Sequence, residues 1–213
     1  MSTTVVLARH GRTPWHADNR YAGSSDVPID DVGRGQAAVL AQWAAGFAPD
    51  ALYCSPLLRA RQTAAPVAEA TGLTARTDDR IREVAFGVAE GRTLDELDPQ
   101  VVARFRADPV AHAFPDGEDP RAAAARAAAW VQETALAHDG GRVLAIAHNT
   151  LLRLLVCHVM GAPLRGYRRV LPKLDSTGLV RLRAGEAGLA LEAYNVPPAA
   201  AVAAGAAERK TLT

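Results

Sequence analysis

Three short runs of this chain are apolar almost throughout, and each is followed by a segment with helical spacing. The runs are VVLA at 5–8, ALYC at 51–54 and RVLAIA at 142–147. A strand that is apolar on both faces needs cover on both faces, which is typical of a parallel sheet between layers of helices. The alternation of such runs with helical segments therefore predicts an α/β fold with a mostly parallel sheet.

Helices and further strands are expected between and after these runs. Helices are predicted at 31–47, from Pro56 to near Gly72, near 93–107, at about 119–138 and at 149–161, and strands around 73–76, 176–183 and 188–195. Residues 83–118 are rich in loop-forming pairs such as FG, EG and DP. The alanine-rich tail from residue 197 has no apolar face, so we expect it to be disordered.

Composition excludes several classes of function. The 213 residues are 49% hydrophobic, which suits one domain with a sizeable core. Lys and Arg number 24 against 23 Asp and Glu, so no global field favours nucleic acid or an anionic membrane. No apolar stretch reaches the ~18 residues of a membrane span. With Cys54 and Cys157 in apolar runs, we expect buried thiols and a cytoplasmic protein without nucleic-acid or membrane partners.

Cationic and imidazole side chains follow all three runs. Arg9 and His10 come directly after the first, Arg59 lies one helical turn beyond the second, and His148 follows the third. The carboxyl ends of strands in such sheets meet at one edge, where ligands bind. Buried charges without a partner cost several kcal/mol, so the sequence predicts an anion at this edge.

A phosphoryl group fits this set of side chains. Histidine forms covalent intermediates, and arginines stabilise the charge that spreads over the equatorial oxygens during phosphoryl transfer. The leaving oxygen then needs a proton from an acid. Glu83 lies in the loop-rich segment that could cover the site.

The motifs and their order resemble a known family. LARHGRT at 7–13, GSSDVPIDDVGRGQA at 23–37, CSPLLRARQTA at 54–64, IREVAFGVAEG at 81–91, FPDGED at 114–119 and AIAHNT at 145–150 follow the histidine phosphatases of the phosphoglycerate mutase-like superfamily. The resemblance covers residues 4–195. It implies a three-layer α/β/α sandwich over residues 1–196, with a small cap at about 86–126, and no metal or other cofactor.

The resemblance also implies roles for individual residues. His10 is expected to become the phosphohistidine, with Arg9, Arg59 and His148 completing the phosphate pocket. Glu83 is expected to donate a proton to the leaving group and later to activate water. The positions at which family members line the substrate entrance are occupied by Gly23 and Ser24.

Four positions depart from the family pattern. Arg12 stands where a glutamate is usual, His16 where an asparagine contacts phosphate, and Asn149 where a glycine is usual. Ala89 replaces a common tryptophan and should widen the site. We expect Arg12, His16 and Asn149 to modify substrate binding. For Arg12 two readings stay open: it attracts a second anionic group of the substrate, or it turns away and pairs with one of three aspartates, Asp18, Asp30 or Asp31.

Three functions are compatible with these residues. A phosphatase acting on a small phosphorylated molecule is favoured, because only 65 positions separate Glu83 from His148, whereas family mutases carry a longer, arginine-rich insertion. A phosphoglycerate mutase-type transferase and a non-catalytic binder of phosphorylated ligands are the alternatives. The sequence leaves a homodimer open and names no substrate. We expect Trp15, Trp43 and Trp130 to be packing residues.

Overall fold

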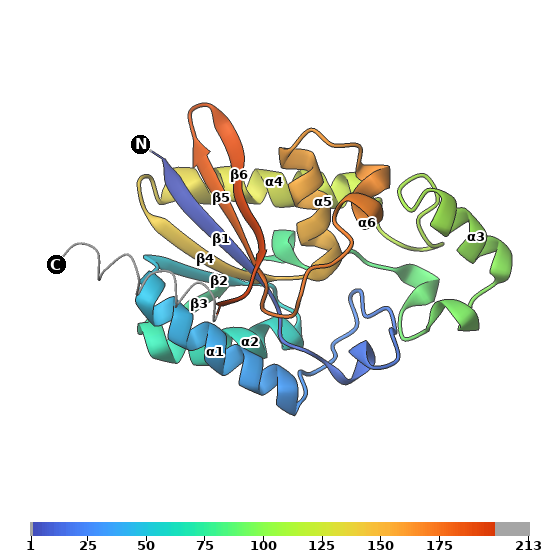
Figure 1. Cartoon of the computed structure of the whole chain (residues 1–213), viewed down its shortest axis with the longest axis horizontal. Coiled ribbons are helices and arrows are strands. Elements are labelled where there is room, and N and C mark those ends of the chain that lie inside the picture. Colours follow the sequence, from blue (N-terminus) through green and yellow to red (C-terminus); the bar gives the residue numbers. More distant parts are fainter. Residues whose placement is uncertain (1, 199–213) are drawn as a thin grey trace.

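One six-stranded sheet with helices on both faces organises the protein, whose computed structural model describes residues 2–198 (Figure 1). The strands are β1 (Thr3–Arg9), β2 (Ala51–Cys54), β3 (Ala75–Thr77), β4 (Arg142–Ala147), β5 (Leu179–Gly185) and β6 (Gly188–Val196), in the order β3-β2-β4-β1-β5-β6. The first four run parallel, and β5 and β6 are antiparallel. The predicted three-layer α/β/α sandwich with a mostly parallel sheet is confirmed.

The central strand shows why the runs are apolar on both faces. Successive side chains of β1 point to opposite sides of the sheet. Val6 and Ala8 pack into the core beneath α1 (Asp31–Phe47) and α2 (Leu58–Thr71). Val5 and Leu7 pack into the core beneath α4 (Pro120–Ala137) and α5 (Asn149–Val159). All four side chains are buried, because each face of the sheet has its own helical layer.

A small cap stands beside the sheet. Between Val84 and Asp119 the chain forms short 3₁₀ turns at Gly87–Ala89 and Leu94–Glu96 and one helix, α3 (Pro99–Ala107), which projects away from the sheet in Figure 1. Phe105 and Phe114 stack with ring centroids 4.1 Å apart, and Tyr21 packs edge-on against both. The cap is thus fastened by an aromatic cluster. Residues 120–126 of the expected cap segment form the first turns of α4.

Some element boundaries differ from the predicted ones for tertiary reasons. The helix expected to open at Pro56 begins at Leu58, whose N–H donates to Asp26 Oδ1 at 2.5 Å from a distant loop. The strand expected from residue 176 begins at 179, because Gly178 N–H closes a turn on the carbonyl of Asp175. β3 covers 75–77 rather than 73–76.

Two expectations from the sequence concern the tail of the chain and membrane-spanning segments. Beyond residue 198, the tail predicted to be disordered lies outside the described residues. Within the described part, no helix combines the length and the apolar character needed to cross a membrane.

Candidate active site

A cavity of about 540 Å³ lies at the carboxyl end of β1 and extends to the cap. It brings together most of the residues singled out in the sequence, which come from five separate segments. Those that line it are Arg9, His10, His16, Gly23, Arg59, Glu83 and Asn149. His148 is fully buried beside them, with its ring centroid 5.1 Å from that of His10. Arg12 and Ser24 are not part of the lining.

The backbone around His10 orients its ring. His10 Nδ1 lies 2.7 Å from the carbonyl oxygen of Gly11, which can only accept, so Nδ1 carries the proton and Nε2 keeps its lone pair. His10 N–H donates to the carbonyl of Ala147 at the end of β4, and Gly11 N–H donates to Thr63 Oγ1 at 2.9 Å. A Cβ on Gly11 would lie 2.7 Å from the Gly33 carbonyl, so only glycine fits there. The ring therefore presents a free Nε2.

Two buried histidines are held neutral. The pKa of His10 lies well below 6.5, chiefly because burial disfavours the charged ring and then because His148 and Arg59 are close. The pKa of His148 is lowered in the same way, by burial first and by Arg59 next. At neutral pH both rings are uncharged, which is the form in which a histidine nitrogen can attack phosphorus.

Arg59 is fixed by the loop that precedes α1. Its Nη1 donates to the Ser25 carbonyl and its Nη2 to the Gly23 carbonyl, both at 2.7 Å. Two of its five N–H groups are thus used and three remain. Ser24 N–H and Oγ–H donate to Glu90, at 2.9 Å from Oε1, so this residue shapes the loop instead of lining the cavity.

Arg9 is paired with His16, one of the residues that depart from the family pattern. Its Nη1 donates to the Leu174 carbonyl at 2.6 Å, and its Nη2 contacts His16 Nε2. Because a guanidinium only donates, Nε2 of His16 accepts in this contact, while Nδ1 of His16 lies 2.8 Å from Thr13 Oγ1 and 3.0 Å from Thr13 N. Burial lowers the pKa of Arg9 to about 10. Burial and Arg9 lower the pKa of His16 to about 4, so His16 holds Arg9 as a neutral ring.

Glu83 is part of the cavity wall, at the start of α5. The sequence analysis placed Glu83 on a segment that could cover the site. The side chain is instead buried in the cavity wall, where it is 6% exposed and accepts from backbone N–H groups. Its Oε1 accepts from Val84 at 3.0 Å and from Leu151 at 2.9 Å, and its Oε2 accepts from Thr150 at 3.0 Å. Oε2 therefore keeps a lone pair for a further proton or hydrogen bond.

A buried ion pair holds the backbone before Glu83. Arg126 donates to the carbonyls of Arg80 and Arg82 at 2.7 and 2.9 Å, and its Nε lies 2.7 Å from Glu118 Oε1. Both partners of this pair are largely buried, with side chains 17% and 14% exposed. Through Arg126, Glu118 of the FPDGED motif thus helps to fix the backbone segment that carries Glu83.

Polar atoms without a partner gather around His10. Six buried side-chain polar atoms of the described chain lack a hydrogen-bond partner, and five of them belong to this site: Arg9 Nε, Arg59 Nε, both ring nitrogens of His148, and Asn149 Oδ1. Each such group costs about 1–3 kcal/mol when it stays unpaired. A ligand with several acceptor oxygens would satisfy the arginine and histidine nitrogens together.

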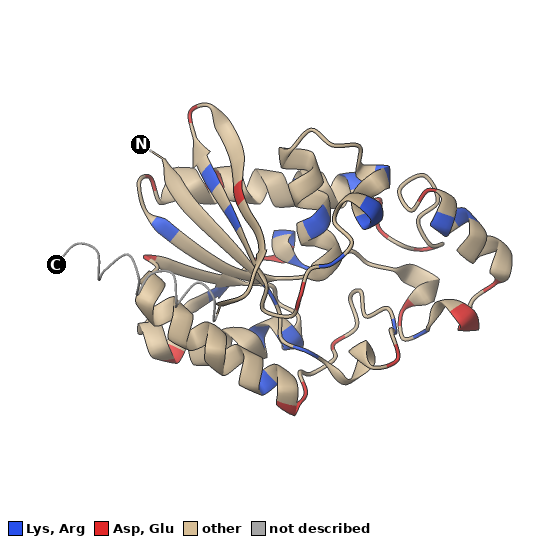
Figure 2. Ribbon diagram, viewed as in Figure 1, with Lys and Arg blue, Asp and Glu red and all other residues tan. Residues whose placement is uncertain are grey.

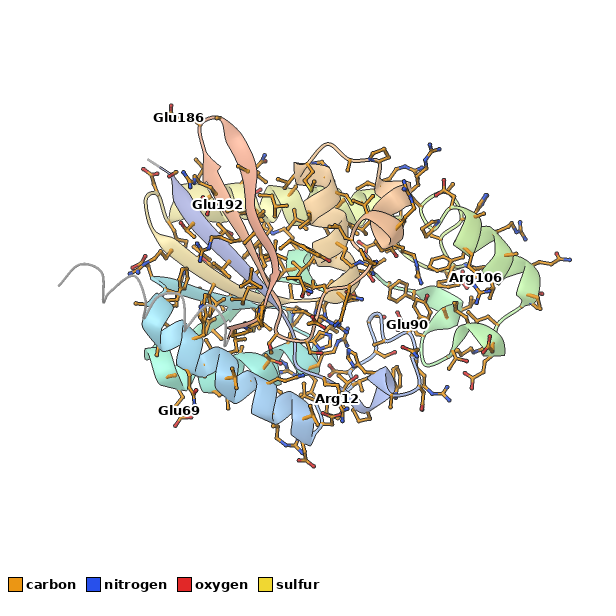
Figure 3. The ribbon with its side chains drawn as sticks, viewed as in Figure 1. Arg12, Glu69, Glu90, Arg106, Glu186 and Glu192 are labelled. Carbon is orange, nitrogen blue, oxygen red and sulfur yellow. The ribbon has the colours of Figure 1, made fainter. Side chains whose placement is uncertain are left out.

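Arg12 lies outside this arrangement. Its Nε donates to Asp30 Oδ2 at 2.8 Å, and its side chain is 45% exposed. Figure 3 shows it at the amino-terminal end of α1, away from the cap. Of the two readings left open by the sequence, this geometry matches the pairing with an aspartate.

Several lining residues were missed by the sequence analysis. Trp15, expected to be a packing residue, belongs to the 3₁₀ turn Pro14–His16, which has no buried residue, and it lines the cavity. On the cap side the lining also includes Arg20, Tyr21, Phe86, Arg106, Arg153 and Arg168. Phe86 belongs to the IREVAFGVAEG motif, whereas the others lie on the loop before α1, on α3, on α5 and on the short helix α6 (Tyr167–Val170), where no motif singled them out.

The sequence and the fold match known proteins. A family model described as "Histidine phosphatase superfamily (branch 1)" matches residues 5–197, and the chain belongs to this family. A probable phosphoglycerate mutase GpmB of Yersinia pestis is 34% identical over 170 residues, which is 78% of this chain and 79% of that protein.

Solved structures agree with this membership. The mycobacterial glucosyl-3-phosphoglycerate phosphatase complexed with VO3 is 27% identical, with a TM-score of 0.80 over 91% of this chain and 98% of that one. A phosphoserine phosphatase mutant from Entamoeba histolytica, in complex with phosphoserine, has a TM-score of 0.82 at 21% identity over 92% and 98% of the two chains, and shares the fold.

The described residues form no cluster of potential metal ligands. Residues 2–198 contain no group of three or more His, Cys, Asp and Glu side chains arranged to hold a metal ion. The positive charge that faces the cavity comes from arginine side chains instead.

Proposed function

We propose that this protein is a phosphatase that hydrolyses a small phosphomonoester through a phosphohistidine at His10, without a metal ion. The observation that carries the proposal is a neutral His10 with a free Nε2, surrounded by buried donors that lack partners. Residues 1–196 would form the phosphatase domain, with the cap over the substrate.

The first half of the reaction would transfer the phosphoryl group to the protein. Nε2 of His10 forms a bond to phosphorus while the bond from phosphorus to the ester oxygen breaks. The remaining N–H groups of Arg9 and Arg59 bind the equatorial oxygens, where charge spreads in the transition state. Glu83 donates the proton that the departing oxygen needs, from Oε2.

The second half would release inorganic phosphate. A water molecule attacks phosphorus, the bond to Nε2 breaks, and Glu83 takes the proton from that water. Gly11 supports both halves, because its carbonyl accepts from Nδ1 whether or not Nε2 carries the phosphoryl group. The ring thus keeps one orientation through the cycle.

A mutase is the second candidate, and the similarity to a probable phosphoglycerate mutase favours it. A mutase must return the phosphoryl group to a second hydroxyl before water reaches it. The cap here holds one nine-residue helix, α3, and leaves a cavity of about 540 Å³. The short cap favours the phosphatase, because family mutases carry a longer insertion between the positions of Glu83 and His148.

The decisive experiment combines turnover with trapping. Wild-type protein should release phosphate from p-nitrophenyl phosphate, and acid-quenched reactions with labelled substrate should contain an acid-labile phosphoryl group. His10→Ala should lose at least ~10³-fold in kcat and show no trapped label, since the nucleophile is gone. His112→Ala, which changes an exposed histidine of the cap, is the matched control. Near-normal turnover by His10→Ala would refute the proposal.

Two further measurements test for mutase activity and for a metal requirement. A mutase would convert 3-phosphoglycerate to its isomer when primed with a bisphosphoglycerate, whereas the phosphatase releases phosphate only. A chelator should leave phosphate release unchanged, and vanadate, which mimics five-coordinate phosphorus, should inhibit. Activity that EDTA abolishes and a divalent metal restores would contradict the metal-independent mechanism.

A further inference from the structure

The cavity contains more positive charge than one phosphate group needs. Its lining has six arginines and three carboxylates: Arg9, Arg20, Arg59, Arg106, Arg153 and Arg168 against Asp18, Glu83 and Asp95. Two of the carboxylates are engaged, Glu83 by backbone N–H groups and Asp18 by Arg20 at 3.6 Å. Arg20 is also paired with Glu96. The surplus charge therefore rests on the other arginines.

Two of these arginines, Arg106 and Arg168, line the cavity from the short helices α3 and α6, at what we call its outer end. Arg168 lies on α6 with its guanidinium 5.2 Å from the ring centroid of Phe105, and it donates to Tyr21 Oη at 3.1 Å. Arg106 follows Phe105 directly, in the last turn of α3 (Figure 3). In the described part of the chain no carboxylate lies within 4.0 Å of either guanidinium.

Arg153 connects this outer pair with the phosphate pocket. It lies on α5, donates from Nε to the Leu171 carbonyl at 2.6 Å, and stacks over Tyr167 at 4.9 Å. Burial lowers its pKa, and Arg168 contributes to that lowering. Arg153 in turn contributes to the lowered pKa of Arg9. Arginines of the cavity lining thus come from α5, α6 and α3, on each of which Figure 2 shows blue segments.

We propose that Arg106 and Arg168 form a second anion-binding subsite, so that the preferred substrate is a phosphomonoester with another anionic group, a carboxylate or a second phosphate, at its far end. The inference rests on the proposed phosphatase function and adds the class of substrate. Planar guanidiniums bind carboxylate and phosphate through paired N–H groups. Tyr21 and Phe105 already hold Arg168, so little side-chain freedom is lost when it binds an anion.

The test compares substrates that differ only in the second anion. 3-Phosphoglycerate against glycerol 3-phosphate tests a carboxylate, and ribose 1,5-bisphosphate against ribose 5-phosphate tests a phosphate. In at least one pair, wild-type protein should prefer the doubly anionic member by about 10-fold in kcat/KM, the effect expected for charged hydrogen bonds at a partly exposed site. The pair with the larger preference identifies the anion.

Variants assign that preference to the two arginines. Arg106→Gln combined with Arg168→Gln should reduce the preference to about twofold or less. Arg104→Gln and Arg169→Gln remove a charge from the same two helices at positions outside the cavity lining and should keep it. Each preference is a ratio measured on one preparation, so a misfolded fraction cancels.

Two results would overturn the inference while phosphatase activity persists. One is a wild-type preference within twofold of unity for both pairs, and the other is a full preference retained in the double variant. Absence of phosphate release from every substrate, p-nitrophenyl phosphate included, would refute the phosphatase itself and the subsite with it.

Discussion

The two ends of the cavity are built in different ways. At the inner end His10, Arg59 and His148 are at most 4% exposed, and they lie beside the carboxyl ends of the central strands. Backbone carbonyls orient His10 and Arg59. At the outer end Arg106 and Arg168 are exposed, on helices of nine and four residues, and the aromatic residues Tyr21 and Phe105 contact Arg168.

In the proposed function this difference separates catalysis from substrate selectivity. Inner side chains would contact the group common to all phosphomonoesters, so changing them should affect every substrate. Outer side chains would face the part of the substrate that varies, so changing them should alter the ratios between substrates. The predictions below test that division, and those for the inner end carry the larger effects.

The largest effect is expected for Glu83→Gln. This change keeps the shape of the side chain but removes the proton for the leaving group, so kcat should fall by ~10²–10⁴-fold on alkyl phosphates. An aryl phosphate needs less protonation and should lose less. Steady-state kinetics on both substrates measure the contrast, with Glu69→Gln on the exposed side of α2 as the control. Equal losses on both would make Glu83 a structural residue.

The inner end should also make stability depend on pH. His10 and His148 have folded-state pKa values well below 6.5, and His16 has one of about 4. The unfolded chain therefore binds more protons below pH 6.5, so stability is full above that pH and falls as the pH drops towards the folded-state values. Each ~1 kcal/mol lost lowers Tm by about 2–4 °C for a chain of this size.

Thermal unfolding between pH 7.5 and 5 measures this dependence. Vanadate should weaken it, because a bound anion stabilises the charged histidines. His148→Gln should reduce the slope and the exposed His112→Ala should leave it unchanged. A Tm that stays constant over this range would contradict the neutral, buried state of the histidines.

A smaller effect is expected for Thr63→Val, which removes the hydroxyl group that links the backbone of Gly11 to α2. Thr63 Oγ1 accepts from Gly11 N–H at 2.9 Å and donates to the Arg59 carbonyl at 2.7 Å. Thr63→Val keeps the volume and leaves a buried N–H unpaired, so the free energy of unfolding should fall by about 1–3 kcal/mol. Denaturant unfolding gives the value.

Thr71→Val is the matched control, because Thr71 bonds only within its own helix. We expect Thr63→Val to lower kcat for all substrates by a similar factor, as befits the inner end. If the factor by which kcat falls differs between substrates, Thr63 contributes to substrate selectivity.

The smallest effect is expected for Arg12→Gln. Its ion pair with Asp30 is partly exposed, with side chains 45% and 18% accessible, and pairs that solvent reaches contribute about 0–1 kcal/mol. Stability should change by less than that, and kcat/KM should change by less than about twofold on singly and doubly anionic substrates alike. A selective loss on the doubly anionic substrate would show that Arg12 turns towards the cavity and would restore the first reading of this residue.

The inner end could be predicted from the sequence, for a physical reason. His10 and His148 directly follow apolar strands, and the carboxyl ends of parallel strands meet at one edge. Glu83 followed from family resemblance, and its backbone partners on α5 were not visible in the sequence.

The outer end could not be predicted, because tertiary contacts create it. Arg168 lies on a four-residue helix without a periodic pattern, and it reaches the cavity through contacts with Tyr21 and Phe105, more than 60 positions away. The orientation of Arg12 depends on Asp30, one of three aspartates that the sequence offered. In both cases the residue type was visible, but the direction of the side chain was not.

The position of β1 in the sheet has a consequence for biosynthesis. His10 is made before most of its surroundings, because β1 lies between the later strands β4 and β5, and Arg9 is fixed by a carbonyl 165 positions later. Such long-range pairing forms late and slows folding. While the nascent chain is still on the ribosome, His10 therefore has no pocket, so we expect chains that lack β4 and β5 to be inert towards phosphorylated metabolites.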